Sequence, residues 1–147
     1  MSSAGWTGAS LSGLTRVPGR EDIEWLPLQH ALRLSAFGTN VFVGPEGGEE
    51  LIGLHDETSE DGQEELYVVL TGTVRFELDG EVLELCREDV IAVRDRSVRR
   101  RATGLEPGSS VLAIGAPPGS LKRSTWRPEW FADVPRLGDG DQRHRPD

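Results

Sequence analysis

Residues 64–86 constrain the fold of this chain more than any other segment, because they indicate three short β-strands joined by two turns. The segment is EELYVVLTGTVRFELDGEVLELC. Apolar and polar residues alternate along 73–78, which is the period of a strand with one buried face. Asp79-Gly80 lies between two such runs and is a strong signal for a tight hairpin. The segment therefore predicts neighbouring strands of one β-structure.

Other parts of the chain repeat this pattern of short strands separated by turn residues. Besides 66–70, 73–78 and 82–86, strands are predicted at 32–37, 40–43, 51–55, 90–93, 98–102 and 111–114. The chain shows no convincing helical period and no internal repeat. These features predict an all-β sandwich or small barrel.

The ends of the chain differ from its centre. Residues 1–22 are rich in Ser, Gly and Thr and are expected to form an N-terminal arm, whereas 23–117 hold the barrel. Residues 118–147 are expected to be a C-terminal extension with a disordered end. Within it, Trp126 and Trp130 are expected on one short helical turn that docks on the barrel or on a partner subunit.

Composition excludes several classes of protein. The 147 residues suffice for one domain, and a net charge of −9 argues against a nucleic-acid partner. No run approaches the roughly 18 apolar residues of a membrane span, and no N-terminal segment has the charged and apolar regions of a secretory signal. We therefore expect a soluble cytoplasmic protein. Its single cysteine, Cys86, excludes an internal disulfide and is expected to be a buried, inert thiol.

A pair of carboxylates, Glu64 and Glu65, opens the first strand of the 64–86 segment. Carboxylates beside a buried strand are costly unless they are paired, hydrogen-bonded or bound to a cation, so this strand suggests a binding site. The segment resembles the first motif of the cupins, Gly-x5-His-x-His-x3,4-Glu-x6-Gly, with Glu65 and Gly72 at the required spacing. The resemblance covers about 32–117 and implies a double-stranded β-helix, the jelly-roll barrel of that family.

The resemblance leaves two alignments for the His-x-His pair of this motif. Strict counting from Glu65 places Ser59 and Asp61 there, inside a polar loop. An insertion of three or four residues instead places His55 and Glu57 there, with both side chains on one side of a strand. We prefer the second alignment because a strand holds ligands more rigidly than a loop does. Tyr67 has the same parity as Glu65 and is expected to line the same cavity.

The second cupin motif, Gly-x5-Pro-x-Gly-x2-His-x3-Asn, is strongly altered. Its histidine position falls on Arg99, or on Arg100 if the register shifts by one. A protonated guanidinium has no lone pair to give and cannot ligate a metal, but it can pair with Glu65 or hold an anion on a ligand.

Most cupins bind a divalent metal such as Fe, Mn, Ni or Zn, and here the resemblance implies His55, Glu57 and Glu65 as the ligands. Because an arginine stands at the fourth ligand position, we favour a pocket without a metal. In that case Arg99 or Arg101 orients a small anionic organic ligand, and Glu57 and Tyr67 contact its polar groups.

Three functions remain open from the sequence. The first is ligand binding with at most acid–base chemistry of the isomerase or epimerase type, in which Glu65 or His55 moves a proton. The second is a metal-dependent dioxygenase or isomerase that uses His55, Glu57 and Glu65. The third is a non-catalytic sensor or interaction module. Cupins commonly form homodimers, and the strand 66–70 is apolar on both faces, so a homodimer is expected.

Overall fold

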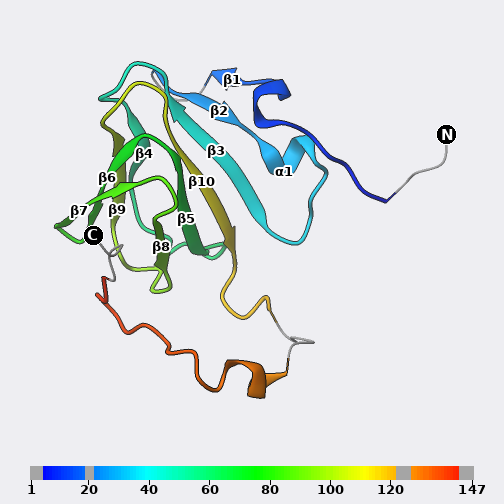
Figure 1. The fold of residues 1–147 in the computed structure, drawn as a ribbon, viewed down its shortest axis with the longest axis vertical. Helices are drawn as coiled ribbons and strands as arrows, with labels where there is room; N and C mark the ends of the chain where they lie inside the picture. Colours follow the sequence, from blue (N-terminus) through cyan, green and yellow to red (C-terminus); the bar gives the residue numbers. More distant parts are fainter. Residues whose placement is uncertain (1–4, 19–21, 122–126, 143–147) are drawn as a thin grey trace.

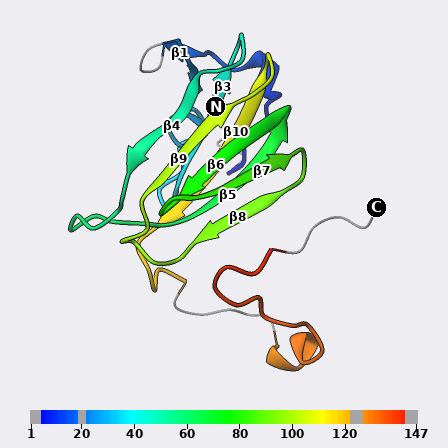
Figure 2. The same cartoon turned by 90° about the vertical axis from the view of Figure 1, so that its left-hand side faces the viewer.

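The structure is a computed structural model of the chain and describes residues 5–18, 22–121 and 127–142. Two antiparallel sheets lie face to face (Figures 1 and 2). The larger sheet has the order β1 (Val17–Pro18), β2 (Glu24–Leu26), β3 (Gly38–Gly44), β10 (Ser109–Ala116), β5 (Glu64–Thr71) and β8 (Val90–Val93). The smaller sheet has the order β4 (Glu50–His55), β9 (Arg100–Gly104), β6 (Thr73–Leu78) and β7 (Glu81–Cys86). The expected all-β jelly roll is confirmed.

The hairpin that was expected at Asp79-Gly80 joins β6 to β7. Both turn residues have positive φ, 48° at Asp79 and 90° at Gly80, which matches the right-handed twist of the two strands. The turn between β5 and β6 needs glycine for a second reason. A Cβ at Gly72 would lie 2.4 Å from the Ser109 hydroxyl oxygen and 2.8 Å from its Cα, so only glycine fits this position.

Apolar side chains fill the space between the two sheets. The buried cluster includes Tyr67, Val69, Phe76 and Val111, which alternate with outward-facing residues along their strands. A second cluster lies on the outer face of the larger sheet, where Leu28 of the short helix α1 (Leu28–Ala31) packs on Leu26 and on strand β3. The larger sheet is thus covered on both faces near β2 and β3.

Three sequence predictions are wrong in detail. Residues 32–37 do not form a strand; they leave α1 through a turn in which Arg33 has a φ of 58°. Strand β9 begins at Arg100, two residues later than expected, because 95–99 form the turn before it. Cys86 is exposed rather than buried, and its thiol lies 3.3 Å from the Asp89 carboxylate, since its side chain points outward from β7.

The two ends contribute short elements. Residues 11–13 form a 3-10 turn, and β1 pairs with β2, so the sheet extends into the expected N-terminal arm. In the C-terminal extension, Pro128–Phe131 form a 3-10 turn in which Trp130 is 62% exposed. Arg94 pairs with Asp139 and links this extension to the barrel. Trp126 lies outside the described residues. No described helix is long and apolar enough to cross a membrane.

The outer face of the larger sheet is uncovered near β5 and β8. Leu66 is 36% exposed and Val90 is 58% exposed on neighbouring strands, far from the cluster that packs under α1. Exposed apolar side chains on a sheet face are suited to subunit contact. The homodimer that we expect from the sequence stays a prediction.

Candidate functional site

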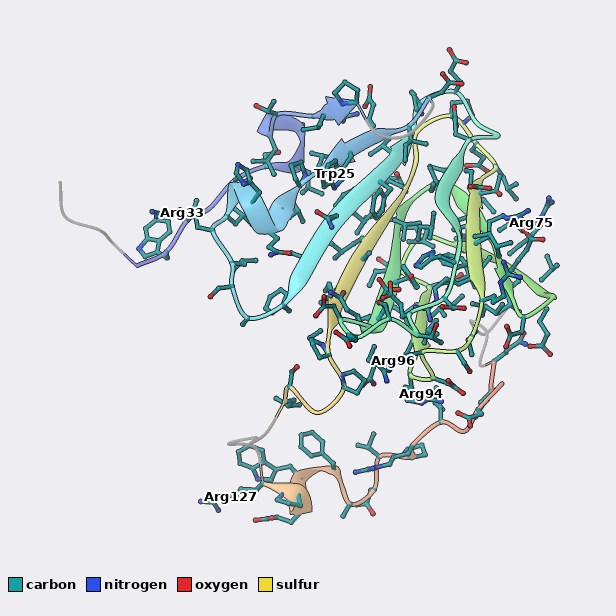
Figure 3. The ribbon with its side chains drawn as sticks, turned by 180° about the vertical axis from the view of Figure 1, so that it is seen from behind. Trp25, Arg33, Arg75, Arg94, Arg96 and Arg127 are labelled. Atoms are coloured by element: carbon teal, nitrogen blue, oxygen red, sulfur yellow. The ribbon has the colours of Figure 1, made fainter. Side chains whose placement is uncertain are left out.

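Four of the predicted site residues, His55, Glu57, Glu65 and Tyr67, meet with Arg100 at one end of the barrel, between the two sheets. His55 is the last residue of β4 and Arg100 is the first residue of β9, and these two are paired across the smaller sheet. Glu65 lies at the start of β5 in the larger sheet. Figure 3 shows Arg94 and Arg96 below the strands, on the loop between β8 and β9 that closes this end. The site is therefore built from both layers of the fold.

A buried ion pair joins the two sheets at this end. Arg100 is fully buried and donates from Nη1 to Oε2 of Glu65 at 2.6 Å. Its Nε and Nη2 donate to the carbonyl of Val98 at 3.2 and 3.1 Å. The Glu65 side chain is 13% exposed, so a bare carboxylate here would be strongly disfavoured. Arg100 supplies the opposite charge next to this carboxylate.

Tyr67 holds the same carboxylate from a second side. Its hydroxyl donates to Oε2 of Glu65, and its ring packs on Phe76 of the other sheet with the centroids 5.4 Å apart. Burial, followed by the charge and hydrogen bond of Glu65, raises the pKa of Tyr67 far above its usual range. Tyr67 is therefore a fixed hydrogen-bond donor over the whole physiological pH range.

His55 is oriented by the backbone of its own strand. Its Nδ1 lies 2.6 Å from the carbonyl oxygen of Gly53, which can only accept, so Nδ1 carries the proton and Nε2 has a free lone pair in the neutral ring. Nε2 lies 3.4 Å from Oε1 of Glu57 and 4.0 Å from Oε2 of Glu65. The reactive nitrogen therefore faces two carboxylates.

Glu57 lies two residues beyond the end of β4, in the loop that precedes β5. Its backbone N–H donates to the carbonyl of Arg96 at 2.8 Å, and its Oε2 accepts from the backbone N–H of Gln63 at 3.4 Å. The loop expected to be an insertion thus folds back and brings Glu57 to His55. The expectation that Glu57 shares a strand with His55 is wrong, because β4 ends at His55 and Glu57 lies in the loop that follows it.

A cavity of about 320 Å³ opens beside His55. Its walls are largely apolar, and its lining residues are Ile23, Trp25, Asn40, Phe42, Leu51, Ile52, Gly53 and His55. The volume is at the lower end of the range for small-molecule sites. Apart from His55, the polar side chains in this lining are those of Asn40 and Trp25. His55 is the residue that this cavity shares with the group formed by Glu57, Glu65, Tyr67 and Arg100.

The structure does not bring Arg99 or Arg101 to this group. Both alternate with Arg100 and point to the outer face of the smaller sheet, where they line a separate cavity of about 260 Å³. Arg101 lies 3.5 Å from Glu50 and from Glu77. Arg100 takes the interior position. The alternation of side chains along a strand could have predicted that Arg100 points inward. Val98 and Ala102, two residues to either side of it, are apolar and pack in the core.

The donor set also fits a divalent metal. His55, Glu57 and Glu65 each offer a ligand atom, and these atoms lie within 4.8 Å of one another. One imidazole and two carboxylates suit Fe, Mn, Ni or Zn. Arg100 and Tyr67 both donate to Oε2 of Glu65, so a metal held by these residues would share this carboxylate with them.

Comparison with known proteins finds likeness in structure rather than in sequence. No protein-family model matches the chain, and no curated protein matches it. The structure of KdgF from a Halomonas species is 16% identical, covers 74% of this chain and 92% of that chain, and has a TM-score of 0.61. A cupin protein from Bacteroides fragilis is 23% identical, covers 90% and 98%, and has a TM-score of 0.58.

A third solved structure is a sugar phosphate isomerase of the cupin superfamily from Silicibacter pomeroyi. It is 20% identical, covers 75% of each chain and has a TM-score of 0.59. Likeness at these identities concerns the fold. The chain has the cupin fold, and the resemblance seen in its first motif is confirmed at that level.

The buried pair predicts a large and specific effect on stability. Arg100→Met leaves Glu65 without its counter-charge, so we expect the free energy of unfolding to fall by about 3–5 kcal/mol. Urea denaturation measures this change. In Arg100→Met/Glu65→Gln, where the lone charge is also gone, part of the loss should return. Arg99→Met is the matched control on the outer face and should change stability by less than about 0.5 kcal/mol. Equal losses in Arg99→Met and Arg100→Met would contradict the pair's role.

Tyr67 is the only tyrosine of the chain, so tyrosinate absorbance at 295 nm reports on it alone. Because its folded-state pKa is raised, the neutral hydroxyl stabilises the fold below about pH 10 and this contribution declines at higher pH. We expect no tyrosinate signal in the folded protein around pH 10–11, and ionisation near pH 10 in concentrated urea. Normal titration of Tyr67 in the folded chain would contradict its buried bond to Glu65.

Proposed function

We propose that this protein binds a small organic ligand beside His55 and moves a proton on it, with the reacting part of the ligand neutral and bearing hydroxyl and carbonyl groups. The observation that carries this proposal is the position of Arg100. Its guanidinium is fully buried, neutralises Glu65 and directs its other donors to the backbone. The charges of Glu65 and Arg100 thus balance each other without a ligand.

The charges around the cavity favour a neutral group next to His55. Arg100 compensates Glu65, which leaves Glu57 as the uncompensated carboxylate 3.4 Å from the imidazole. No lysine or arginine is among the residues that line the cavity. An anion about 4 Å from Glu57 would be repelled by about 4 kcal/mol at an effective dielectric constant near 20. The anionic ligand that we expected from the sequence therefore has no counter-charge at this position.

His55 has the geometry of a general base. Its Nε2 lone pair is free to accept a proton, and Glu57 is placed to accept a hydrogen bond from that nitrogen once it is protonated. On a hydroxy-carbonyl compound, Nε2 takes the proton from the hydroxyl-bearing carbon next to the carbonyl, and the electron pair left behind forms an enediolate. Return of the proton to the opposite face of that carbon gives epimerisation. Its delivery to the former carbonyl carbon, with a proton moved from the hydroxyl oxygen to the carbonyl oxygen, gives isomerisation. The sugar phosphate isomerase with this fold is consistent with such chemistry.

Hydrogen exchange tests this proposal without knowledge of the natural substrate. Incubation with hydroxy-aldehydes and hydroxy-ketones of three to six carbons in D₂O should replace the carbon-bound proton, which ¹H NMR detects. His55→Gln should slow this exchange by about 10²–10⁴-fold, the usual contribution of a general base. Arg99→Met, on the outer face, should exchange at the wild-type rate. Exchange that is equally fast in His55→Gln would refute the role of His55.

A metal-dependent enzyme is the second candidate, and the spacing of His55, Glu57 and Glu65 favours it specifically. A bound metal would act there as a Lewis acid on a ligand oxygen. In that case protein purified without chelator should contain about one equivalent of Fe, Mn, Ni or Zn by elemental analysis. His55→Gln and Glu57→Gln should each lose most of it. A stoichiometric metal that both variants lose would replace the metal-free proposal.

A further inference from the structure

A second and larger cavity adjoins the first. It has a volume of about 780 Å³ and is lined by Val17, Trp25, Pro27, Gln29, His30, Arg33, Leu34 and Asn40. Trp25 and Asn40 line both cavities, so the two cavities are neighbours that share these side chains. Figure 3 shows Trp25 and Arg33 near α1, on the side of the barrel away from Arg75. A ligand long enough to pass Trp25 would extend from His55 toward Arg33.

The charge of the second cavity is opposite to that of the whole chain. The sequence has 25 acidic and 16 basic residues, yet no Asp or Glu is among the lining residues, which include Arg33 and His30. Neither of these two side chains makes a hydrogen bond or an ion pair with another described residue. They are free to donate to a group that enters the cavity.

Arg33 has a left-handed backbone conformation that is usually found at glycine. After α1, the N–H of Leu34 bonds to the carbonyl of Gln29 and the N–H of Arg33 bonds to that of His30, which together form a Schellman cap. In this cap Arg33 occupies the left-handed position, with a φ of 58°, where glycine is preferred because a Cβ is strained there. An arginine at a position that favours glycine indicates that its side chain serves a purpose other than stability.

The side chain of Trp25 forms a wall common to both cavities. Its indole Nε1–H is shielded from solvent and has no acceptor in the described part of the chain. Because this nitrogen has no surface open to either cavity, it is not a donor for a ligand there, and the rest of the ring is what a ligand would contact.

We propose that the second cavity binds an anionic oxygen group, a carboxylate or a phosphate, through Arg33 and His30. This group forms the distal end of the ligand whose neutral end lies beside His55. The link to His55 rests on the proposed function, whereas the anion site itself stands on the residues of the second cavity. The ligand class that follows is a hydroxy-carbonyl compound with a terminal acidic group.

Titration of the full ¹⁵N-labelled chain with inorganic phosphate, and separately with acetate, tests the anion site. We expect saturable shifts of the Trp25 indole N–H and of the amides of 29–34. Arg33→Met should weaken the tighter-binding anion at least tenfold. Arg33→Gly should weaken it similarly while raising the melting temperature by a few degrees, because glycine relieves the left-handed backbone. The anion with the higher affinity identifies the acidic group.

Two control variants separate the possible failures. Arg75→Met removes an exposed arginine of the smaller sheet and should bind anions like the wild type. His55→Gln should also keep its anion affinity, so loss of proton exchange without loss of anion binding would refute the function at His55 alone. Equal anion affinity in the wild type and Arg33→Met, or shifts spread over all exposed arginines, would overturn the anion site.

Discussion

The contact between Glu65 and Arg100 organises this end of the barrel. It joins β5 of one sheet to β9 of the other, and the arginine is fully buried. In such surroundings neither charge is tolerated without the other, so the pair constrains the spacing of the two layers as well as their charge. Tyr67 adds a second bond to the same oxygen, and its ring packs on Phe76 across the layers. Arg100 and Tyr67 are therefore both held in place by this one carboxylate oxygen.

The same contact separates the roles of the two carboxylates. Glu65 is held by Arg100 and Tyr67 and is suited to positioning, whereas Glu57 lies on a loop and faces His55. Because Nδ1 of His55 is committed to the carbonyl of Gly53, the proton-accepting atom is Nε2, on the side of Glu57. One end of the barrel thus holds a rigid ion pair next to a pair of groups able to exchange a proton.

Much of the fold was predictable because its signals are local. The Asp79-Gly80 turn, the alternation along β6 and the glycine at 72 each express a constraint that acts within a few residues. Counting the motif spacing placed Arg99 at the interior position and left Arg100 open as a shift of one residue; the structure has Arg100 inside. The strand period on its own selects Arg100, since it shares a face with Val98 and Ala102.

Other features had no local signal. Residues 32–37 alternate in the manner of a strand, yet they follow a helical turn whose Leu28 is buried on the outer face of the larger sheet. The sequence shows neither that packing nor the left-handed backbone at Arg33. The closeness of Glu57 to His55 depends on a loop that folds back onto Arg96, which is likewise a tertiary contact.

The charges near the two cavities suggest how an anionic ligand could bind although Glu57 lies next to His55. Beside His55, Glu57 is uncompensated and Arg100 is already occupied, so a negative group there meets repulsion. In the adjoining cavity Arg33 and His30 are unpaired within the described chain and no carboxylate lines the wall. A ligand with one neutral and one acidic end fits these charges in one orientation only. Its neutral end then lies beside His55, and its acidic end lies beside Arg33 and His30. Charge separation between the cavities would therefore set both the class of ligand and the end of it that reaches His55.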